Sequence, residues 1–325
     1  MMSKPYVLIT RKLPEDVIAP LSAIAEVEMW PHEDAAMPRD VLAEKAKRAA
    51  AILPMVSDPI DEGVLSACSA LKVVANMGVG YDNIDVSAAA RRGIVVCNTP
   101  DVLTDTTADL TFALLLATAR RLVEAAEFLK EGQWKSWSPF LLAGADVHHK
   151  TMGIVGMGNI GQAVAKRAKG FEMNVLYYNR SRRPEAEKKL GAVYRPFFDL
   201  LAESDFVVCL TPLTPETRHL FNREAFRQMK SSAIFINAAR GAVVDEQALY
   251  EALVHGEIAA AGLDVFEKEP VDPTHPLISL PNVVALPHIG SATHETRRAM
   301  MTLARDNIIA VLEGRPPLTP VNRPS

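Results

Sequence analysis

The sequence predicts an α/β protein with two doubly wound parallel sheets. Three observations support this fold class. The chain has 325 residues, and at roughly 150 residues per domain that length suggests two domains. Short apolar runs alternate with helical patterns in two separate blocks, one before residue 100 and one after residue 150. A glycine-rich turn opens the second block between an expected strand and an expected helix, as parallel βαβ units require.

In the first block, four apolar runs are expected to form strands: Tyr6–Thr10, Ala51–Pro54, Leu71–Ala75 and Ile94–Asn98. Between these strands, Pro38–Ala50 and Asp61–Ser69 have patterns that suit helices. Strands separated by helices at this spacing imply parallel βαβ units.

A long helix is expected over Thr106–Leu129, because this segment is rich in Ala and Leu and contains neither Gly nor Pro. A loop should follow over Gly132–Lys150. Helices are expected over Ile160–Ala168 and His294–Leu312, and a Pro-rich tail ends the chain. The second block should hold six strands: Met152–Val155, Asn174–Tyr178, Phe206–Leu210, Ala233–Asn237, Ala259–Leu263 and Val283–Leu286.

The composition excludes several classes of protein. The net charge is −4 and the sequence pI is about 6.1, which argues against a nucleic-acid binder because that role needs a clustered positive field. The three cysteines, Cys68, Cys97 and Cys209, show no metal-ligand spacing, so neither zinc nor a disulfide scaffold is expected. The apolar stretch Leu110–Ala119 is half of the roughly 20 residues that span a bilayer. We expect a cytoplasmic protein without metal, membrane or nucleic-acid partners.

The glycine-rich turn reads Gly156-Met157-Gly158-Asn159-Ile160-Gly161, which is a GxGxxG motif. In such a motif the first glycine makes the tight turn, the second lets the backbone approach a pyrophosphate, and the third packs helix on strand. The alternative is a structural glycine-rich turn. The flanking strand and helix favour dinucleotide binding, with Asn159 and Ile160 at the positive end of the helix. The second block therefore predicts a Rossmann-like cofactor domain.

A second motif concerns the choice of cofactor. Asn179 lies 18 residues after Gly161 and is followed by Arg180, Ser181 and Arg182. NAD sites usually carry Asp or Glu at this position to bind the ribose 2′-hydroxyl. A neutral Asn with guanidinium groups beside it favours a 2′-phosphate. We therefore predict that the protein binds NADPH, with NADH as the weaker alternative. The other interpretation is that these arginines form a solvated charged turn without a ligand.

Three residues stand out as candidates for chemistry. Arg240 follows the expected strand Ala233–Asn237, and His288 follows Val283–Leu286. Glu269 lies in the loop after a third strand. Ligands of open parallel sheets bind outside the carboxyl ends of the strands, so the three side chains are expected to converge beside a nicotinamide.

The sequence resembles the D-isomer-specific 2-hydroxyacid dehydrogenases over nearly its whole length. Four blocks carry the resemblance: Gly156–Gly161, Phe235–Asp245, Ala261–Pro270 and Pro287–Thr293. Within the family, Lys230–Asn237 and Gly290–Arg297 are typical of the glyoxylate/hydroxypyruvate reductases and 2-ketogluconate reductases.

The resemblance implies a role for each candidate residue. His288 would be the general acid, Glu269 would pair with it and favour its charged form, and Arg240 would hold the substrate carboxylate. Leu53 would line the substrate pocket, and the backbone of Val79 and Gly80 would donate N–H groups to the substrate carboxylate. Others would contact the cofactor: Thr107, Thr211, Pro212, Thr217, Ala238, Asp264 and Gly290.

The resemblance also implies how the chain is organised. A flavodoxin-like substrate domain would comprise residues 1–100 and 288–325, and an NAD(P)-binding Rossmann domain residues 101–287. The enzyme would be a homodimer with residues 106–150 at the interface. Leu141 stands where a partner-subunit tryptophan of this branch would cap the active site, which favours larger 2-oxo acids.

The expected function is NADPH-linked reduction of glyoxylate, hydroxypyruvate or 2-ketogluconate to the D-2-hydroxy acid. Two alternatives stay open. One is an enzyme similar to D-3-phosphoglycerate dehydrogenase, and the other is a nucleotide-sensing protein similar to certain transcriptional corepressors.

Overall fold

The computed structural model describes residues 4–322. The chain divides into two compact units, Met1–Leu103 with Ala292–Ser325, and Thr104–Ser291. Each unit contains one parallel β-sheet. The two crossings between the units come a few residues later than the expected 100/101 and 287/288, so that His288 belongs to the second unit. The assignment of substrate and cofactor to the two units stays a prediction.

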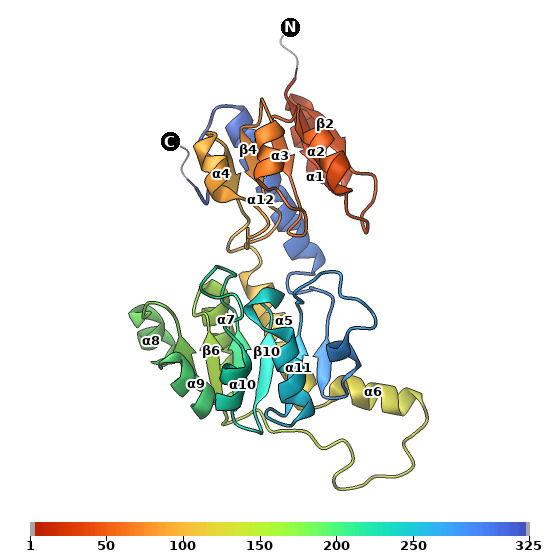
Figure 1. Cartoon of the computed structure of the whole chain (residues 1–325), viewed down its shortest axis with the longest axis vertical. Coiled ribbons are helices and arrows are strands. Elements are labelled where there is room, and N and C mark those ends of the chain that lie inside the picture. Colours follow the sequence, from red (N-terminus) through yellow and green to blue (C-terminus); the bar gives the residue numbers. More distant parts are fainter. Residues whose placement is uncertain (1–3, 323–325) are drawn as a thin grey trace. The chain divides into compact units, whose positions relative to one another are not determined.

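The first unit has a five-stranded parallel sheet in the order β2-β1-β3-β4-β5, which is the flavodoxin-like order. Its strands are β1 (Tyr6–Ile9), β2 (Glu26–Met29), β3 (Ala51–Leu53), β4 (Val73–Ala75) and β5 (Val95–Cys97). Its helices are α1 (Glu15–Ile24), α2 (Arg39–Ala46), α3 (Glu62–Ala67), α4 (Val86–Arg91) and α12 (His294–Leu312). Strands β2 and β4 of this sheet are labelled in Figure 1.

The sheet of the first unit is covered on both faces. Tyr6, Leu8, Ile52 and Val74 belong to one hydrophobic core, and successive side chains of a strand point to opposite faces. The neighbours Val7 and Ile9 are fully buried as well. Continuous apolar runs such as β1 are the pattern of parallel strands with helices on both sides.

The second unit has a seven-stranded parallel sheet in the order β12-β11-β10-β9-β6-β7-β8. When β6 is counted as strand 1 and the sheet is read from β8 to β12, the order is 3-2-1-4-5-6-7. This is the Rossmann order 3-2-1-4-5-6 with a seventh strand at one edge. Its strands are β6 (Thr151–Val155), β7 (Asn174–Tyr178), β8 (Val193–Tyr194), β9 (Phe206–Cys209), β10 (Ile234–Asn237), β11 (Ala260–Leu263) and β12 (Val283–Ala285). The predicted fold class is confirmed.

The helices of the second unit cover both faces of this sheet. Val155, Val207 and Phe235 face one core, whereas Ile154 and Phe206 face the other, as the two-residue period of a strand requires. The helices are α5 (Thr104–Ala119), α6 (Leu122–Lys130), α7 (Asn159–Ala168), α8 (Pro184–Leu190), α9 (Phe197–Glu203), α10 (Arg223–Gln228) and α11 (Glu246–Val254), with short 3-10 helices at Lys169–Phe171, Gly241–Val243 and Pro276–Ser279.

The expected single helix over Thr106–Leu129 is wrong, because the chain breaks between α5 and α6. Arg121 adopts a left-handed backbone with φ of +52°. The N–H of Ala145, from the returning loop, donates to the carbonyl of Ala119 at 2.8 Å. A Cβ on Gly144 would lie 2.2 Å from that same carbonyl. This tertiary contact replaces the next intrahelical hydrogen bond and ends α5.

Several short helices and strands were not predicted from the sequence. They are α1, β2, α4, α8, β8, α9, α10 and α11. All of them have ten residues or fewer, a length at which periodicity is a weak signal. Within residues 4–322, no helix has the length and apolarity needed to cross a membrane.

Candidate active site

The glycine motif lies at the point where the order of the large sheet reverses. Gly156 follows β6 and has φ of +111°, a conformation that L side chains rarely adopt. A Cβ there would lie 2.6 Å from the backbone of Leu210, at the end of the neighbouring strand β9. Gly156 therefore makes the tight turn between β6 and α7, as the sequence predicts.

The other two glycines are compatible with the remaining functions of the motif. A Cβ on Gly161 would lie 2.1 Å from the carbonyl oxygen of Gly156, so only glycine allows α7 to pack this closely. A Cβ on Gly158, the residue before α7, would meet nothing within 4 Å. Open space in front of a helix N-terminus fits a pyrophosphate. The residues present are thus compatible with a bound dinucleotide.

The end of β7 is tied to this glycine loop. The N–H of Met157 donates to Oδ1 of Asn179 at 2.7 Å. Asn179 thereby has one side-chain acceptor in use and its amide NH₂ left to donate. Arg180 and Ser181 are exposed. Arg182 makes two hydrogen bonds to Glu187, at 3.1 and 2.7 Å, and its contact with a cofactor stays a prediction.

The remaining predicted cofactor residues are in loops at the carboxyl edge of the sheet or on α5. Thr211, Pro212 and Thr217 form the loop after β9, where the hydroxyl of Thr217 donates to the carbonyl of Pro212 at 2.7 Å. Ala238 follows β10 directly. Thr107 is buried on α5, beside Gly290.

His288 and Glu269 form a close pair. Nδ1 of His288 lies 2.6 Å from Oε2 of Glu269, and the two side chains are 31% and 30% exposed. The other carboxylate oxygen of Glu269 accepts a hydrogen bond from the N–H of Phe266 at 3.0 Å. Nε2 of His288 is thus the ring nitrogen that can meet a substrate.

The loop that carries His288 is held by Asp264. The carboxylate oxygens of Asp264 accept hydrogen bonds from the N–H groups of Ile289 and Gly290, at 2.7 and 2.8 Å. Its carbonyl accepts from the N–H of His288, whose φ is +54°. Burial raises the pKa of Asp264. Asp264, expected only as a cofactor contact, thus also determines the backbone position of His288.

Arg240 is the third residue after β10, and its backbone is held by Asn237. The amide of Asn237 donates to the carbonyl of Arg240 at 3.0 Å and accepts from the N–H of Ala239 at 3.1 Å. The Arg240 guanidinium is close enough for its charge to help lower the pKa of Glu269. The structure therefore pairs Glu269 with His288 at 2.6 Å and places Arg240 near enough for its charge to act on Glu269.

The pKa of Glu269 yields a prediction about stability. Burial by itself would raise this pKa, but the hydrogen bonds from His288 and from the N–H of Phe266, together with the charges of His288 and Arg240, outweigh burial and lower it below the ordinary value of 4.5. A depressed carboxylate pKa stabilises the fold above the unfolded-state pKa, and this contribution disappears as pH falls through the folded-state pKa.

We therefore expect Glu269→Gln to lower the free energy of unfolding by about 1 kcal/mol at pH 7, and by less as the pH falls below 4.5. Urea unfolding of both proteins between pH 3.5 and 7 measures the difference. A difference that stays constant over this range contradicts the prediction.

The predicted substrate residues of the first unit follow its strands. Leu53 is the last residue of β3 and is buried. Val79 and Gly80 lie in the loop after β4, where their carbonyls accept hydrogen bonds from the amides of Asn98 and Asn76, at 2.8 and 2.7 Å. This loop is thus firmly held. Its contact with a substrate stays a prediction.

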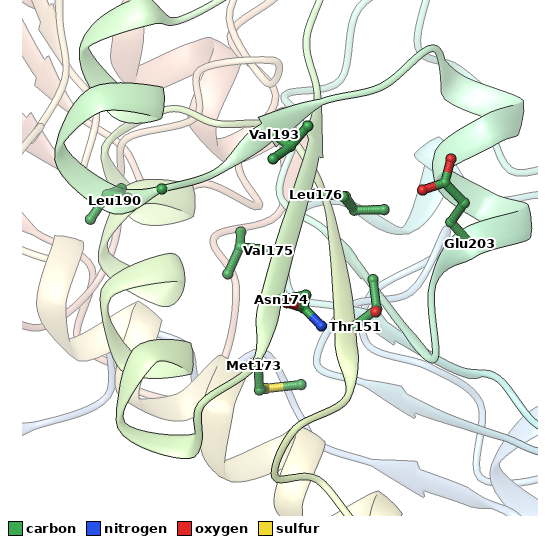
Figure 2. A pocket seen from close by; sticks show the side chains of 9 residues that line it. Thr151, Met173, Asn174, Val175, Leu176, Leu190, Val193 and Glu203 are labelled. Atoms are coloured by element: carbon green, nitrogen blue, oxygen red, sulfur yellow. The ribbon is translucent and has the colours of Figure 1, made fainter.

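A pocket of about 360 Å³ lies elsewhere in the second unit. Figure 2 shows Thr151 and Asn174 beside it, at the amino ends of β6 and β7, and Glu203 is another of its lining residues. The glycine motif follows the carboxyl end of β6, so this pocket is not the nucleotide site. Among residues 4–322, no group of three or more His, Cys, Asp or Glu side chains could hold a metal ion.

Known proteins are similar to this chain over nearly its whole length. Residues 112–290 match the family model of the D-isomer specific 2-hydroxyacid dehydrogenase NAD binding domain. The chain is 54% identical to the glyoxylate reductase of Thermococcus kodakarensis, over 98% of this chain and 97% of the relative. It is 52% identical to the glyoxylate reductase of Pyrococcus furiosus, over 98% and 96%.

Solved structures are similar over the same length. A protein from Thermus thermophilus superimposes with a TM-score of 0.90 at 48% identity, covering 98% of this chain and all of the other. The NADPH-dependent glyoxylate/hydroxypyruvate reductase of Sinorhizobium meliloti, in complex with NADP and malonate, has a TM-score of 0.86 at 36% identity, covering 99% and 98%. The chain therefore belongs to the D-isomer specific 2-hydroxyacid dehydrogenase family and is an NAD(P)-dependent enzyme of that family.

Proposed function

We propose that this dehydrogenase reduces a small 2-oxo acid, namely glyoxylate, hydroxypyruvate or 2-ketogluconate, to the D-2-hydroxy acid with NADPH. The observation that carries the proposal is the His288–Glu269 pair, 2.6 Å apart, in the same unit as Arg240 and the glycine motif. The names of the relatives, glyoxylate reductase and glyoxylate/hydroxypyruvate reductase, support the two smaller substrates. Leu141, in place of an aromatic cap, supports the larger one.

In this proposal each residue does one part of the work. The Arg240 guanidinium binds the substrate carboxylate through two parallel hydrogen bonds and polarises the 2-oxo group. The protonated His288 gives its proton to the carbonyl oxygen, and Glu269 stabilises its positive charge beforehand. NADPH supplies the hydride that reduces C2 of the acid.

Initial rates of NADPH oxidation with the three acids, and with NADH in parallel, test the proposal. We expect turnover with NADPH, and the rank order of kcat/KM names the preferred acid. Tight NADPH binding without turnover would instead favour a nucleotide-sensing protein. Turnover confined to 3-phosphohydroxypyruvate, added to the panel, would favour the phosphoglycerate dehydrogenase alternative.

The preference for NADPH rests on the end of β7. Asn179 presents an amide rather than a carboxylate, and the exposed Arg180 and Ser181 follow it. A carboxylate there would repel a 2′-phosphate, whereas a guanidinium and a hydroxyl can bind one. Because Arg182 is paired with Glu187, we assign the phosphate contact chiefly to Arg180 and Ser181.

We expect Asn179→Asp to shift the ratio of kcat/KM for NADPH over NADH by about tenfold or more toward NADH, because a carboxylate binds the ribose 2′-hydroxyl and repels a phosphate. Asp retains the acceptor for the N–H of Met157, so the glycine loop should keep its shape. The matched control is Arg182→Ala, which should change the ratio by less than Arg180→Ala does. An unchanged ratio in Asn179→Asp contradicts the phosphate assignment.

We also propose a homodimer, formed through part of the segment 106–150. Helix α5 is packed within its own unit, but α6 has no buried residue. Trp134, Trp137 and Phe140 in the following loop are 58%, 79% and 86% exposed. Figure 1 shows this loop extending away from the sheet of its unit. An apolar surface of this kind is typical of a subunit interface.

We expect a solution mass of twice the chain mass of 35.4 kDa, measured by light scattering. The double variant Trp137→Ser with Phe140→Ser should dissociate at concentrations where the parent is dimeric. Val254→Ser, another exposed apolar residue, is the control and should not change the mass. A monomeric parent contradicts the proposal.

The free thiols of all three cysteines suit a reducing cytoplasm, which we propose as the compartment.

A further inference from the structure

A second pair of a carboxylate and an imidazole is linked to the turn that carries Glu269. Glu246, the first residue of α11, lies with Oε2 at 3.2 Å from Nε2 of His275. The two side chains are 17% and 26% exposed. Neither residue was singled out by the sequence analysis, and neither has a place in the proposed mechanism.

Glu246 holds the turn that carries Glu269. Its other oxygen, Oε1, accepts a hydrogen bond from the backbone N–H of Glu267 at 2.7 Å. The preceding N–H, that of Phe266, donates to Glu269 itself. Two consecutive N–H groups of this turn thus bind two carboxylates, one that anchors the turn to α11 and one that contacts His288.

The hydrogen bonds of His275 determine its tautomer. Nδ1 accepts from the N–H of Leu277 at 3.3 Å, at the start of the 3-10 helix Pro276–Ser279. Nδ1 therefore carries no proton, and Nε2 donates to Glu246. The ring of His275 also packs edge-on against Phe266, with centroids 6.2 Å apart. His275 in this way fixes the orientation of the Glu246 carboxylate.

The loop that carries Arg240 meets the same turn. A Cβ on Gly241 would lie 1.8 Å from the backbone of Phe266, so these two segments are in direct backbone contact. The segment 240–246 therefore holds the Phe266–Glu269 turn at two points, Gly241 and Glu246. Arg240 lies at one end of this segment and the Glu246–His275 pair at the other.

We propose that Glu246 and His275 are positioning residues, which hold the Phe266–Glu269 turn so that Glu269 keeps His288 in place for proton transfer. This inference rests on the proposed function, in which His288 is the proton donor. A small displacement of a proton donor lowers the rate of the chemical step much more than it lowers binding.

Conservative variants separate the two contacts of each residue. In the parent, the Glu246 carboxylate accepts from two groups, the N–H of Glu267 and Nε2–H of His275. The amide of Glu246→Gln has a single oxygen and can accept from only one of them. Its NH₂ then faces the other donor. His275→Asn keeps an acceptor for the N–H of Leu277 and loses the donor to Glu246. His275→Gln keeps a donor that reaches Glu246 and loses that acceptor.

We expect Glu246→Gln and His275→Asn to lower kcat for the preferred 2-oxo acid by about tenfold, with KM for NADPH changed by less than about twofold. His275→Gln should retain at least half of the parent kcat. Thermal midpoints are measured for each variant, and the comparison of His275→Asn with His275→Gln carries the test if Glu246→Gln is unfolded.

Arg218→Gln is the matched control, because Arg218 pairs with the side chain of Glu267 at 2.9 Å and not with its N–H. It should leave kcat unchanged. Equal losses of kcat in His275→Asn and His275→Gln, or an unchanged kcat in Glu246→Gln, overturn the positioning role.

His288→Gln is assayed in parallel. If it retains full turnover, the proposed function fails and this inference fails with it, whereas an inactive His288→Gln beside a fully active Glu246→Gln overturns this inference alone.

Discussion

Replacing His288 with alanine is expected to lower kcat for 2-oxo acid reduction by about three orders of magnitude, and to leave the Kd of NADPH nearly unchanged. The side chain is held by Glu269 through Nδ1, which leaves Nε2 to donate the proton. The glycine loop is held by its own hydrogen bond to Asn179, so cofactor binding should be preserved. The loss should therefore fall on the chemical step.

Steady-state rates together with fluorescence titration of NADPH separate these effects. His294→Ala is a suitable control, because His294 is only the first residue of α12. Full turnover in His288→Ala would exclude His288 as the proton donor. A parallel loss of NADPH affinity would show that His288 acts on the cofactor as well.

The second large effect is expected for Arg240. We expect Arg240→Ala to lower kcat/KM for the 2-oxo acid by about a hundredfold or more, since two charge-assisted hydrogen bonds to the substrate carboxylate are lost. Both KM and kcat should change, because the guanidinium binds the carboxylate and also polarises the 2-oxo group. The Kd of NADPH should not change.

Arg240→Lys distinguishes bidentate recognition from charge alone. Lysine keeps the positive charge but not the planar fork of two parallel donors. We expect Arg240→Lys to recover only a small part of the lost kcat/KM. Full recovery would show that a point charge is sufficient. An unchanged profile over the three acids in Arg240→Ala would exclude the carboxylate role. Circular dichroism of both variants controls for the fold, because the backbone of Arg240 is itself held by Asn237.

The sequence alone was sufficient for the fold class and for the glycine motif. Strands such as β7 and β9 are continuous apolar runs, and this pattern is local, so it can be read without knowing the neighbours of the strand. The same holds for Gly156 and Gly161, whose requirement for glycine follows from a turn and a close helix contact within one βαβ unit. Helix α12 also has the bounds that its pattern predicts.

Only the tertiary structure decided the features that depend on residues distant in the chain. The break after α5 comes from the carbonyl of Ala119 accepting the N–H of Ala145. Arg182, which the sequence predicts at the cofactor, is paired with Glu187. Asp264 uses both carboxylate oxygens to hold the loop of His288.

The sequence by itself therefore determined the two parallel sheets and the motifs at their strand ends, because apolar periodicity and glycine conformation act over a few residues. The tertiary structure decided which polar side chains are free for ligands and which are bound to the protein, as for Arg182, Asp264 and Glu246. The physical reason is that a hydrogen bond needs two atoms within about 3 Å, and the pairs that meet this condition are set by how the loops after different strands pack together.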